Sequence, residues 1–146
     1  MKAKSILITG CSSGIGYCVA HGLQQRGHQV IASCRAAEDV ERLQQEGLSC
    51  IQLDLNDSES IQSAYDECMQ LCNGRLDALF NNGAYGLAGA VEDISRAAIR
   101  DQFETNVFGW LELTNLVLPG MRRQGSGRII QNSSVLGFVA LPYRGA

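Results

Sequence analysis

Short apolar runs alternate with segments of helical periodicity along the whole chain. The apolar runs predict buried strands, and the segments with apolar residues three and four positions apart predict amphipathic helices. We expect strands at residues 6–8, 28–34, 50–53, 77–80 and 128–132. We expect helices at residues 14–26, 37–46, 58–72 and 95–121, and a loop from residue 133 onward. Because crossovers of helix length connect parallel strands, the pattern predicts a single α/β domain with a doubly wound parallel sheet.

A glycine-rich turn follows the first apolar run. Gly10, Gly14 and Gly16 fall between the end of that strand and the start of the first helix. Glycine allows positive φ and a close approach of two backbones, and the free N–H groups of a helix start attract an anion. The stretch therefore predicts a phosphate cradle, although an ordinary strand–turn–helix connection would have the same pattern.

Polar residues stand where each later strand ends. They are Arg35, Asp54, Asn81, Asn82, Ser133 and Ser134. Since the carboxyl ends of parallel strands meet at one edge, where such sheets bind their ligands, these residues predict a single binding site there.

Arg35 is the most informative of these residues. In dinucleotide-binding sheets an acidic residue at this place binds the ribose hydroxyls, whereas an arginine accommodates a 2′-phosphate. Here Arg35 follows Cys34, and no carboxylate precedes Glu38. We therefore expect NADP(H) to be preferred over NAD(H), the alternative being a solvated arginine at a strand end.

Asp54 and Asn106 each leave two interpretations open. Asp54 either accepts a hydrogen bond from an adenine amino group or caps the next helix. Asn106 falls inside the expected helix 95–121, where asparagine is unfavourable because its amide competes for backbone groups. It either holds a water molecule near the site or is exposed.

Ser133 and Ser134 end the fifth strand, so a hydroxyl there would point into the site. The only histidines are His21, on the first helix, and His28, at the opposite end of the sheet. A Ser-His-Asp hydrolase is therefore not expected. A serine that holds a substrate carbonyl by a hydrogen bond fits the pattern better.

Composition narrows the function further. The 146-residue chain has a net charge of −3 and no basic cluster longer than Arg122-Arg123, so nucleic acid is not expected as a partner. Its six cysteines include no Cys-x-x-Cys, and no histidine lies near Cys68 and Cys72, which predicts free thiols in a reducing cytoplasm and no metal site. No apolar stretch approaches the length of a membrane span.

Together these motifs resemble the N-terminal part of a classical short-chain dehydrogenase/reductase. Residues 9–16 resemble the family's Thr-Gly-x-x-x-Gly-x-Gly cofactor motif, and residues 81–84 resemble its Asn-Asn-Ala-Gly motif, with the last two residues exchanged. Residues 129–137 match the segment that carries the catalytic serine. The resemblance implies a Rossmann-type fold and an oxidoreductase that interconverts a small-molecule carbonyl and an alcohol with NADP(H), homo-oligomeric at full length.

The resemblance also assigns roles to individual residues. Ser134 and Asn106 match the family's catalytic serine and asparagine. The residues that match cofactor-binding positions are Gly10, Ser12, Ser13, Gly14, Ile15, Gly16, Arg35, Asp54, Leu55, Asn82 and Gly83.

One part of the family's machinery is missing from the chain. The family's proton donor belongs to a Tyr-x-x-x-Lys motif, with the tyrosine thirteen residues after the catalytic serine, which corresponds to position 147. Tyr143 lies too close to Ser134 to replace it, and we interpret it as a substrate-side loop residue. We therefore expect residues 1–146 to be a C-terminally incomplete domain whose sheet is truncated after the fifth strand, and a fragment inactive alone.

Two other function classes remain as alternatives. One is a dinucleotide-binding module without chemistry, although a sensor would not need Asn106 and Ser134. The other is a nucleotide-binding methyltransferase, against which Arg35 argues because that fold usually has a carboxylate for the ribose.

Overall fold

A parallel five-stranded sheet runs through the middle of the computed structural model, which describes residues 2–145. Its strands are β1 (Ser5–Ile8), β2 (Gln29–Cys34), β3 (Ser49–Gln52), β4 (Ala78–Asn81) and β5 (Arg128–Gln131). They lie in the order β3-β2-β1-β4-β5, and every neighbouring pair is parallel. The chain reverses its direction of winding between β3 and β4, so the sheet is doubly wound, as the sequence predicts.

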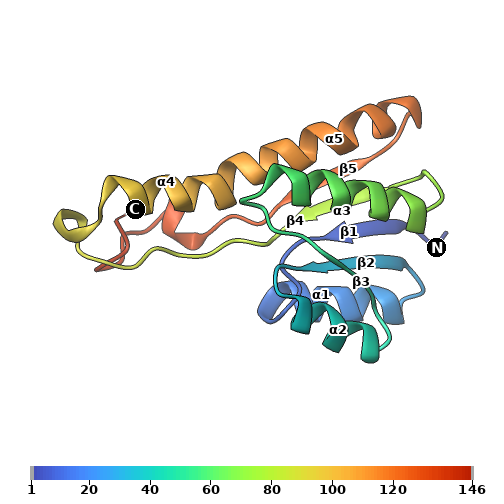
Figure 1. Cartoon of the computed structure of the whole chain (residues 1–146), viewed down its shortest axis with the longest axis horizontal. Helices are drawn as coiled ribbons and strands as arrows, with labels where there is room; N and C mark the ends of the chain where they lie inside the picture. The colour runs from blue at the N-terminus through green and yellow to red at the C-terminus, as the bar shows by residue number, and fades with distance from the viewer. Residues whose placement is uncertain (1, 146) are drawn as a thin grey trace.

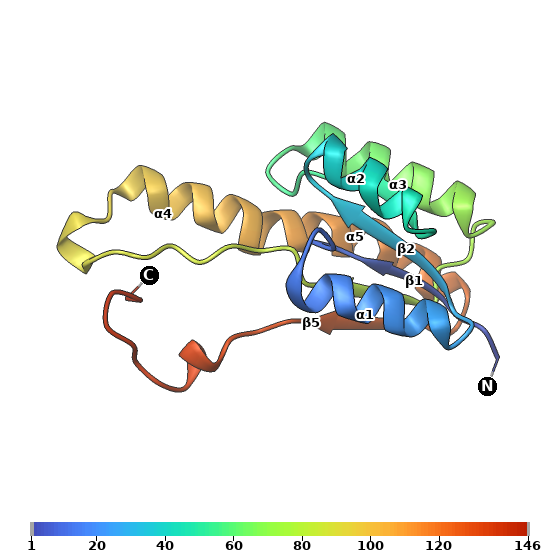
Figure 2. The same cartoon turned by 90° about the horizontal axis from the view of Figure 1, so that it is seen from below.

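Helices cover both faces of this sheet. They are α1 (Gly14–Gln25), α2 (Ala37–Gln45), α3 (Ser58–Leu71), α4 (Arg96–Phe103) and α5 (Gly109–Arg123). Figure 1 shows α1 and α2 below the sheet and α3 and α5 above it, with α4 extending past the carboxyl ends of the strands. Seen from below, α1 and α2 lie in front of the sheet, with β1 and β2 visible between them (Figure 2). None of the helices within residues 2–145 has the length and apolar character needed to cross a membrane.

The core consists of two apolar layers separated by the sheet. All four residues of β1 are buried, because this strand has a neighbour on each side and helices above and below. Leu7 faces the α3 and α5 side, and Ile6 and Ile8 face the α1 and α2 side. This alternation follows from the two-residue period of a strand. Packing on both faces fixes the carboxyl ends of the strands, from which the functional loops leave.

The expected helix 95–121 is wrong in its details. A π-helical turn, η2 (Glu104–Phe108), separates α4 from α5. The Gly109 N–H bonds to Glu104 O, five residues back, instead of four. A π turn accommodates one extra residue without ending the helix, so the apolar spacing on either side still looks helical.

The C-terminal segment also differs from the expected loop. Residues 135–137 form the short 3₁₀ turn η3 (Val135–Gly137), and Gly89 forms a bridge with Arg144. A second 3₁₀ turn, η1 (Val91–Asp93), precedes α4. Elsewhere the expected boundaries are within two residues of the observed ones, as is usual for element ends.

Candidate functional site

The glycine-rich loop brings β1, α1 and the loop after β4 into close contact. Gly10 has φ +69°, and a Cβ added to Gly16 would lie 2.6 Å from Asn82 Nδ2 and would overlap Gly10 O. Such distances exclude any side chain at position 16. Only glycines allow the start of α1 to approach the end of β1 this closely, which explains this part of the motif.

The N-terminus of α1 has no side chain that caps it. Ser13 is the N-cap residue, but its hydroxyl accepts no capping hydrogen bond, and the first turn has no acidic residue. The free N–H groups and the positive end of the helix dipole therefore remain available to an anion. Gly14 and Ile15 are exposed beside them, as a phosphate cradle requires.

A cleft of about 200 Å³ opens at the carboxyl edge of the sheet beside this loop. Six of the expected cofactor-binding residues line it: Gly10, Ser12, Arg35, Asp54, Leu55 and Gly83. Ser13, Gly14, Ile15 and Gly16 do not line the cleft itself but form the adjoining start of α1.

Arg35 lies exposed in the cleft wall at the end of β2. Its carbonyl accepts a hydrogen bond from Gln52 Nε2 at 3.0 Å, which fixes the backbone. Among residues 2–145, no carboxylate forms an ion pair with its guanidinium. This cation is therefore available to an anionic ligand.

Asp54 does not cap α3, so that alternative is wrong. The N-cap is Asp57, which accepts from Glu59 N at 3.0 Å. Asp54 Oδ1 instead accepts from Asn56 N at 2.9 Å, and this local turn holds the carboxylate in the cleft wall. The remaining acceptor capacity of the carboxylate is compatible with an adenine amino group.

Asn82 connects the carboxyl ends of three strands. Its Nδ2 donates to Thr9 O and Gly10 O at 3.0 and 3.1 Å, and its Oδ1 accepts from Asn132 Nδ2 at 2.9 Å. Thr9 Oγ1, almost fully buried, accepts from Asn82 N at 2.9 Å and Gly83 N at 2.8 Å. Asn82 thus holds the carboxyl ends of β1, β4 and β5 together.

A second cavity of about 490 Å³ adjoins the cleft, sharing Ala84 and Tyr85 with it. Ser134, Asn106 and Asn82 all line this cavity, so the two expected catalytic residues come together although they lie on different elements. Ser134 caps η3, and its Oγ accepts from Leu136 N at 3.1 Å. Its hydroxyl proton is consequently left free to donate to a ligand.

Asn106 is neither fully exposed nor directed at open solvent. Its Nδ2 donates to Tyr85 O at 2.7 Å, and its Oδ1 accepts from Tyr85 N at 3.1 Å. The amide therefore fixes the loop that separates the cleft from the second cavity. The π turn places Asn106 at this point, and π turns occur frequently at functional sites.

Several positioning residues could not be identified from the sequence. Trp110 Nε1 donates to Gly83 O at 2.7 Å, and Arg42 reaches Ser12 O at 2.7 Å. Tyr143, expected on the substrate side, has a side chain that is 70% exposed, and the neighbouring Arg144 lines the second cavity instead. The unfavourable position of Asn106 inside a helix is the sequence feature that could have indicated the π turn before Trp110.

The cysteines contribute no reactive group to the site. All six are free, and within residues 2–145 no cluster could hold a metal ion. Burial behind the glycine-rich loop raises the pKa of Cys11 to about 12. A hydrogen bond with Cys34, 3.9 Å away between sulfurs, and burial raise the pKa of Cys50. Cys11 and Cys50 therefore remain protonated at neutral pH.

Known proteins are similar to this chain in sequence and in fold. A sequence model of the short chain dehydrogenase family matches residues 4–146. An uncharacterized oxidoreductase, YbbO of Escherichia coli K12, is 45% identical over 143 residues, which cover 98% of this chain and 53% of YbbO. Human retinol dehydrogenase 8 is 38% identical, with 92% of this chain and 45% of that protein covered. The chain therefore spans about half the length of these curated relatives.

Solved structures agree with the sequence comparison. A short-chain dehydrogenase from Streptomyces avermitilis superposes with a TM-score of 0.88 at 35% identity, covering 97% of this chain and 53% of that one. ElxO with NADP bound superposes with a TM-score of 0.87 at 28% identity, covering 98% and 60%. With the glycine-rich loop, the Asn82 contacts and the Ser134 cavity in place, these matches show that the chain belongs to the classical short-chain dehydrogenase/reductase family, a family of oxidoreductases.

Proposed function

We propose that this chain binds NADP(H) at the carboxyl edge of its sheet and is the cofactor-binding part of an oxidoreductase that interconverts an aldehyde or ketone and an alcohol. The observation that carries the proposal is Arg35, a cation with no carboxylate partner among residues 2–145, in a cleft that also contains part of the glycine-rich loop. Guanidinium matches a phosphate in charge and geometry, so Arg35 would hold the 2′-phosphate.

Other residues of the cleft fit the rest of the dinucleotide. The uncapped N-terminus of α1 would hold the pyrophosphate, because its N–H groups have no partner side chain. Asp54 and Leu55 would contact the adenine. The cradle depends on bare glycine backbone, since a Cβ on Gly10 would overlap Gly83. One solved structure that this chain resembles, ElxO, has NADP bound, which supports the cofactor class.

The second cavity would receive the substrate. Bound NADPH supplies the hydride that reduces a carbonyl carbon. Ser134 would donate its hydroxyl proton in a hydrogen bond to the carbonyl oxygen, which orients and polarises it. Asn106 would keep Tyr85 and its loop in place between cofactor and substrate.

The chain has no residue suited to donate the proton. A tyrosine has a pKa near 10 and needs a neighbouring cation to act at neutral pH. The lysines are Lys2 and Lys4, so none of the four tyrosines belongs to a Tyr-x-x-x-Lys motif. We therefore expect cofactor binding without turnover in residues 1–146.

Cofactor binding can be measured through the single tryptophan, Trp110, which bonds to Gly83 at the cleft. NADPH should quench its fluorescence saturably. Arg35→Asp should weaken NADPH binding by roughly 100-fold, because a charge-assisted contact becomes a repulsion, and NADH binding by less than about threefold. The control is Arg123→Asp, an equal change of charge at an exposed position at the end of α5. Equal losses for both cofactors would refute the 2′-phosphate role.

Turnover separates the proposal from a binding module without chemistry. The 146-residue chain, mixed with NADPH and a broad aldehyde panel, should show no protein-dependent oxidation of NADPH. Saturable oxidation would refute the claim that residues 1–146 lack a proton donor. In a longer native chain with the Tyr-x-x-x-Lys motif, reduction of an aldehyde is expected. Cofactor binding without turnover in that longer chain would favour the module, against which the shared cavity of Ser134 and Asn106 argues.

A further inference from the structure

Arg42 on α2 contacts the glycine-rich loop from outside the cleft. One of its terminal nitrogens, Nη2, donates to Ser12 O at 2.7 Å and to Asp39 Oδ1 at 2.7 Å. The other, Nη1, donates to Glu46 Oε1 at 3.1 Å. The guanidinium thus makes three hydrogen bonds, and one of the acceptors is a backbone carbonyl of the cofactor loop.

The partners of Arg42 hold it in a fixed orientation. Asp39 and Glu46 lie three residues before and four after it, so they share its face of the helix. Glu46 also pairs with His21 of α1 at 3.1 Å. Hydrogen bonds from Tyr17 first, and then from Arg42 and His21, lower the pKa of Glu46, which keeps it charged. These contacts connect α1, α2 and the loop between β1 and α1.

A hydrogen bond to Ser12 O determines how the next N–H is presented. The peptide group is planar and trans, so the Ser12 carbonyl and the Ser13 N–H point in opposite directions. When Arg42 holds the carbonyl towards α2, the Ser13 N–H points away from α2. The charge on the guanidinium also polarises this peptide and strengthens its N–H as a donor. Without this hydrogen bond, rotation about ψ of Ser12 and φ of Ser13 would be free to reorient the peptide.

We propose that Arg42 is a positioning residue for the diphosphate of the dinucleotide, acting through Ser12 and without touching the cofactor. This inference rests on the proposed cofactor-binding function. It distinguishes two arginines by role. Arg35 recognises the 2′-phosphate directly and so selects NADPH over NADH, whereas Arg42 supports the binding of every ligand that carries the diphosphate.

Three ligands separate these roles in the 146-residue chain. NADPH has both a diphosphate and a 2′-phosphate. ADP has the diphosphate but no 2′-phosphate, and adenosine 2′-phosphate has no diphosphate. Arg42→Met should weaken NADPH and ADP by about tenfold each and leave adenosine 2′-phosphate within about twofold. Arg35→Asp should give the reverse pattern for the two smaller ligands. Affinities are measured by calorimetry well below the unfolding temperature of each variant.

Arg75→Met is the matched control. Arg75 also forms an ion pair between elements, with Asp77 at 3.1 Å, and is about as exposed as Arg42, at 51% against 42% of the side chain. It lies at the opposite edge of the sheet, so its loss should lower the unfolding temperature without changing any of the three affinities. This control separates positioning of the loop from general stability.

Arg42→Lys keeps the charge but replaces the planar fork, whose two terminal nitrogens reach Ser12, Asp39 and Glu46, with a single ammonium nitrogen. ADP affinity should remain at least about threefold below that of the unmodified chain in this variant. If Arg42→Met does not fold, the ADP affinity of Arg42→Lys tests the role of Arg42 in its place. Unchanged ADP affinity in Arg42→Met, or an equal loss for adenosine 2′-phosphate, would overturn the inference. Absence of NADPH binding to the unmodified chain would instead overturn the proposed function.

Discussion

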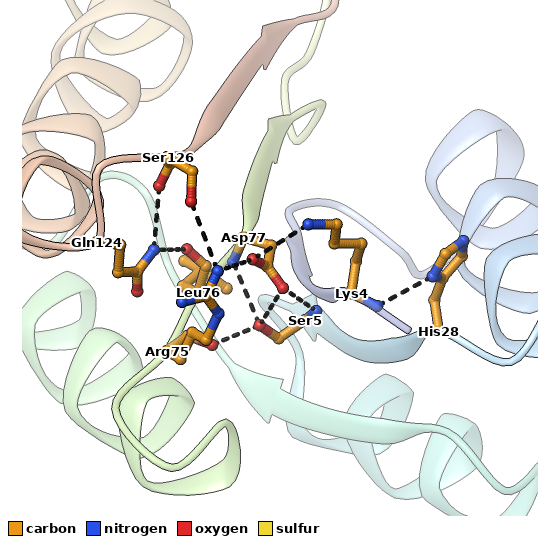
Figure 3. A network of polar contacts seen from close by, with 8 residues as sticks. All are labelled: Lys4, Ser5, His28, Arg75, Leu76, Asp77, Gln124 and Ser126. Atoms are coloured by element: carbon orange, nitrogen blue, oxygen red, sulfur yellow. Dashed lines mark hydrogen bonds and ion pairs between the residues drawn. The ribbon is translucent and has the colours of Figure 1, made fainter. Parts of the chain in front are cut away.

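The two edges of the sheet differ in whether their charged groups and helix ends have partners within the chain. At the amino edge, Asp77 is largely buried and accepts from Ser5 N at 3.1 Å while pairing with Arg75 at 3.1 Å and Lys4 at 3.6 Å (Figure 3). At the carboxyl edge, Arg35 has no such partner within residues 2–145, and the start of α1 is uncapped.

The amino-edge network joins segments distant in sequence. Ser5 Oγ donates to Arg75 O, and Gln124 Nε2 donates to Leu76 O at 3.0 Å and to Ser126 O at 3.2 Å (Figure 3). Polar groups that are paired within the chain stabilise the fold, and polar groups left without a partner are available to a ligand. The amino-edge groups therefore serve the stability of the fold, whereas the carboxyl edge combines paired groups such as Thr9 and Asn82 with groups that are available to a ligand.

The largest expected effect comes from Gly16→Ala. The added methyl group would overlap Gly10 O and Asn82 Nδ2, so α1 must move away from β1. We expect the free energy of unfolding to fall by more than about 3 kcal/mol and NADPH binding to be lost. Urea denaturation and a fluorescence titration measure the two effects.

Gly22→Ala is the control in the same helix. An added Cβ there meets no atom within 4 Å, and alanine is the better helix former. Stability should rise by about 0.5–1 kcal/mol with NADPH affinity unchanged. Comparable damage from both substitutions would mean that the close contact of position 16 with Gly10 and Asn82 does not account for the first result.

Thr9→Val tests how the carboxyl edge is assembled. Valine has nearly the same shape but no acceptor for the N–H groups of Asn82 and Gly83, which bond to the buried Thr9 hydroxyl. The free energy of unfolding should fall by about 2–3 kcal/mol, and NADPH binding should weaken because Gly83 lines the cleft. Thr9→Ser keeps the hydroxyl and should lower the free energy of unfolding by less than about 1.5 kcal/mol. A larger decrease for Thr9→Ser than for Thr9→Val would contradict this explanation.

Asp77→Asn tests the amino edge. The substitution removes the charge that Lys4 and Arg75 pair with, and the free energy of unfolding should fall by about 2 kcal/mol. NADPH affinity should stay within about twofold, because Asp77 lies at the far edge of the sheet from the cleft. A loss of binding as large as the loss from Thr9→Val would break the division between the two edges.

Asp77 should also make the free energy of unfolding depend on pH in the acid range. Burial alone would raise its pKa, but the Ser5 N–H, Arg75 and Lys4 outweigh burial and lower the pKa below its ordinary value of 3.8. The folded chain therefore binds fewer protons than the unfolded chain. The contribution of Asp77 is complete above about pH 4 and is lost as pH falls through the lowered pKa. Denaturation curves should show a smaller loss of stability on acidification for Asp77→Asn than for the unmodified chain.

Trp110→Phe has the smallest expected effect. It removes the indole hydrogen bond to Gly83 O but keeps an aromatic ring against the core. NADPH affinity, measured by calorimetry since the fluorescent reporter is gone, should fall about threefold with a stability loss of about 1 kcal/mol. An unchanged affinity would show that Gly83 is held without Trp110.

The sequence predicts those parts of the structure that a local residue pattern determines. The apolar runs predict the strands, and Gly10, Gly14 and Gly16 predict the turn between β1 and α1. Arg35 and Ser134 were expected at one edge because parallel strands place their carboxyl ends together, and the structure has them there. The assignment of NADP(H), the cytoplasmic location and the homo-oligomer stay predictions.

Contacts between distant segments could not be predicted in the same way. The hydrogen bond of Trp110 to Gly83 and that of Arg42 to Ser12 span 27 and 30 residues. Trp110 fits equally well as an ordinary core residue, and Arg42 as a solvated helix charge. The apolar pattern does not predict the π turn at Glu104–Phe108, because one inserted residue barely changes the apolar period. Only the unfavourable position of Asn106 indicated it.

Amide chemical shifts of the ¹⁵N-labelled chain, recorded with increasing NADPH, test the division of the sheet most directly. We predict saturable shifts at residues 10–16, at Arg35, Asp54 and Leu55, and in the loop from Gly83 to Tyr85. The amides of Ser5, Asp77 and Gln124 at the amino edge should not move. Shifts centred on the amino edge, or none at the glycine-rich loop at saturation, would contradict the account.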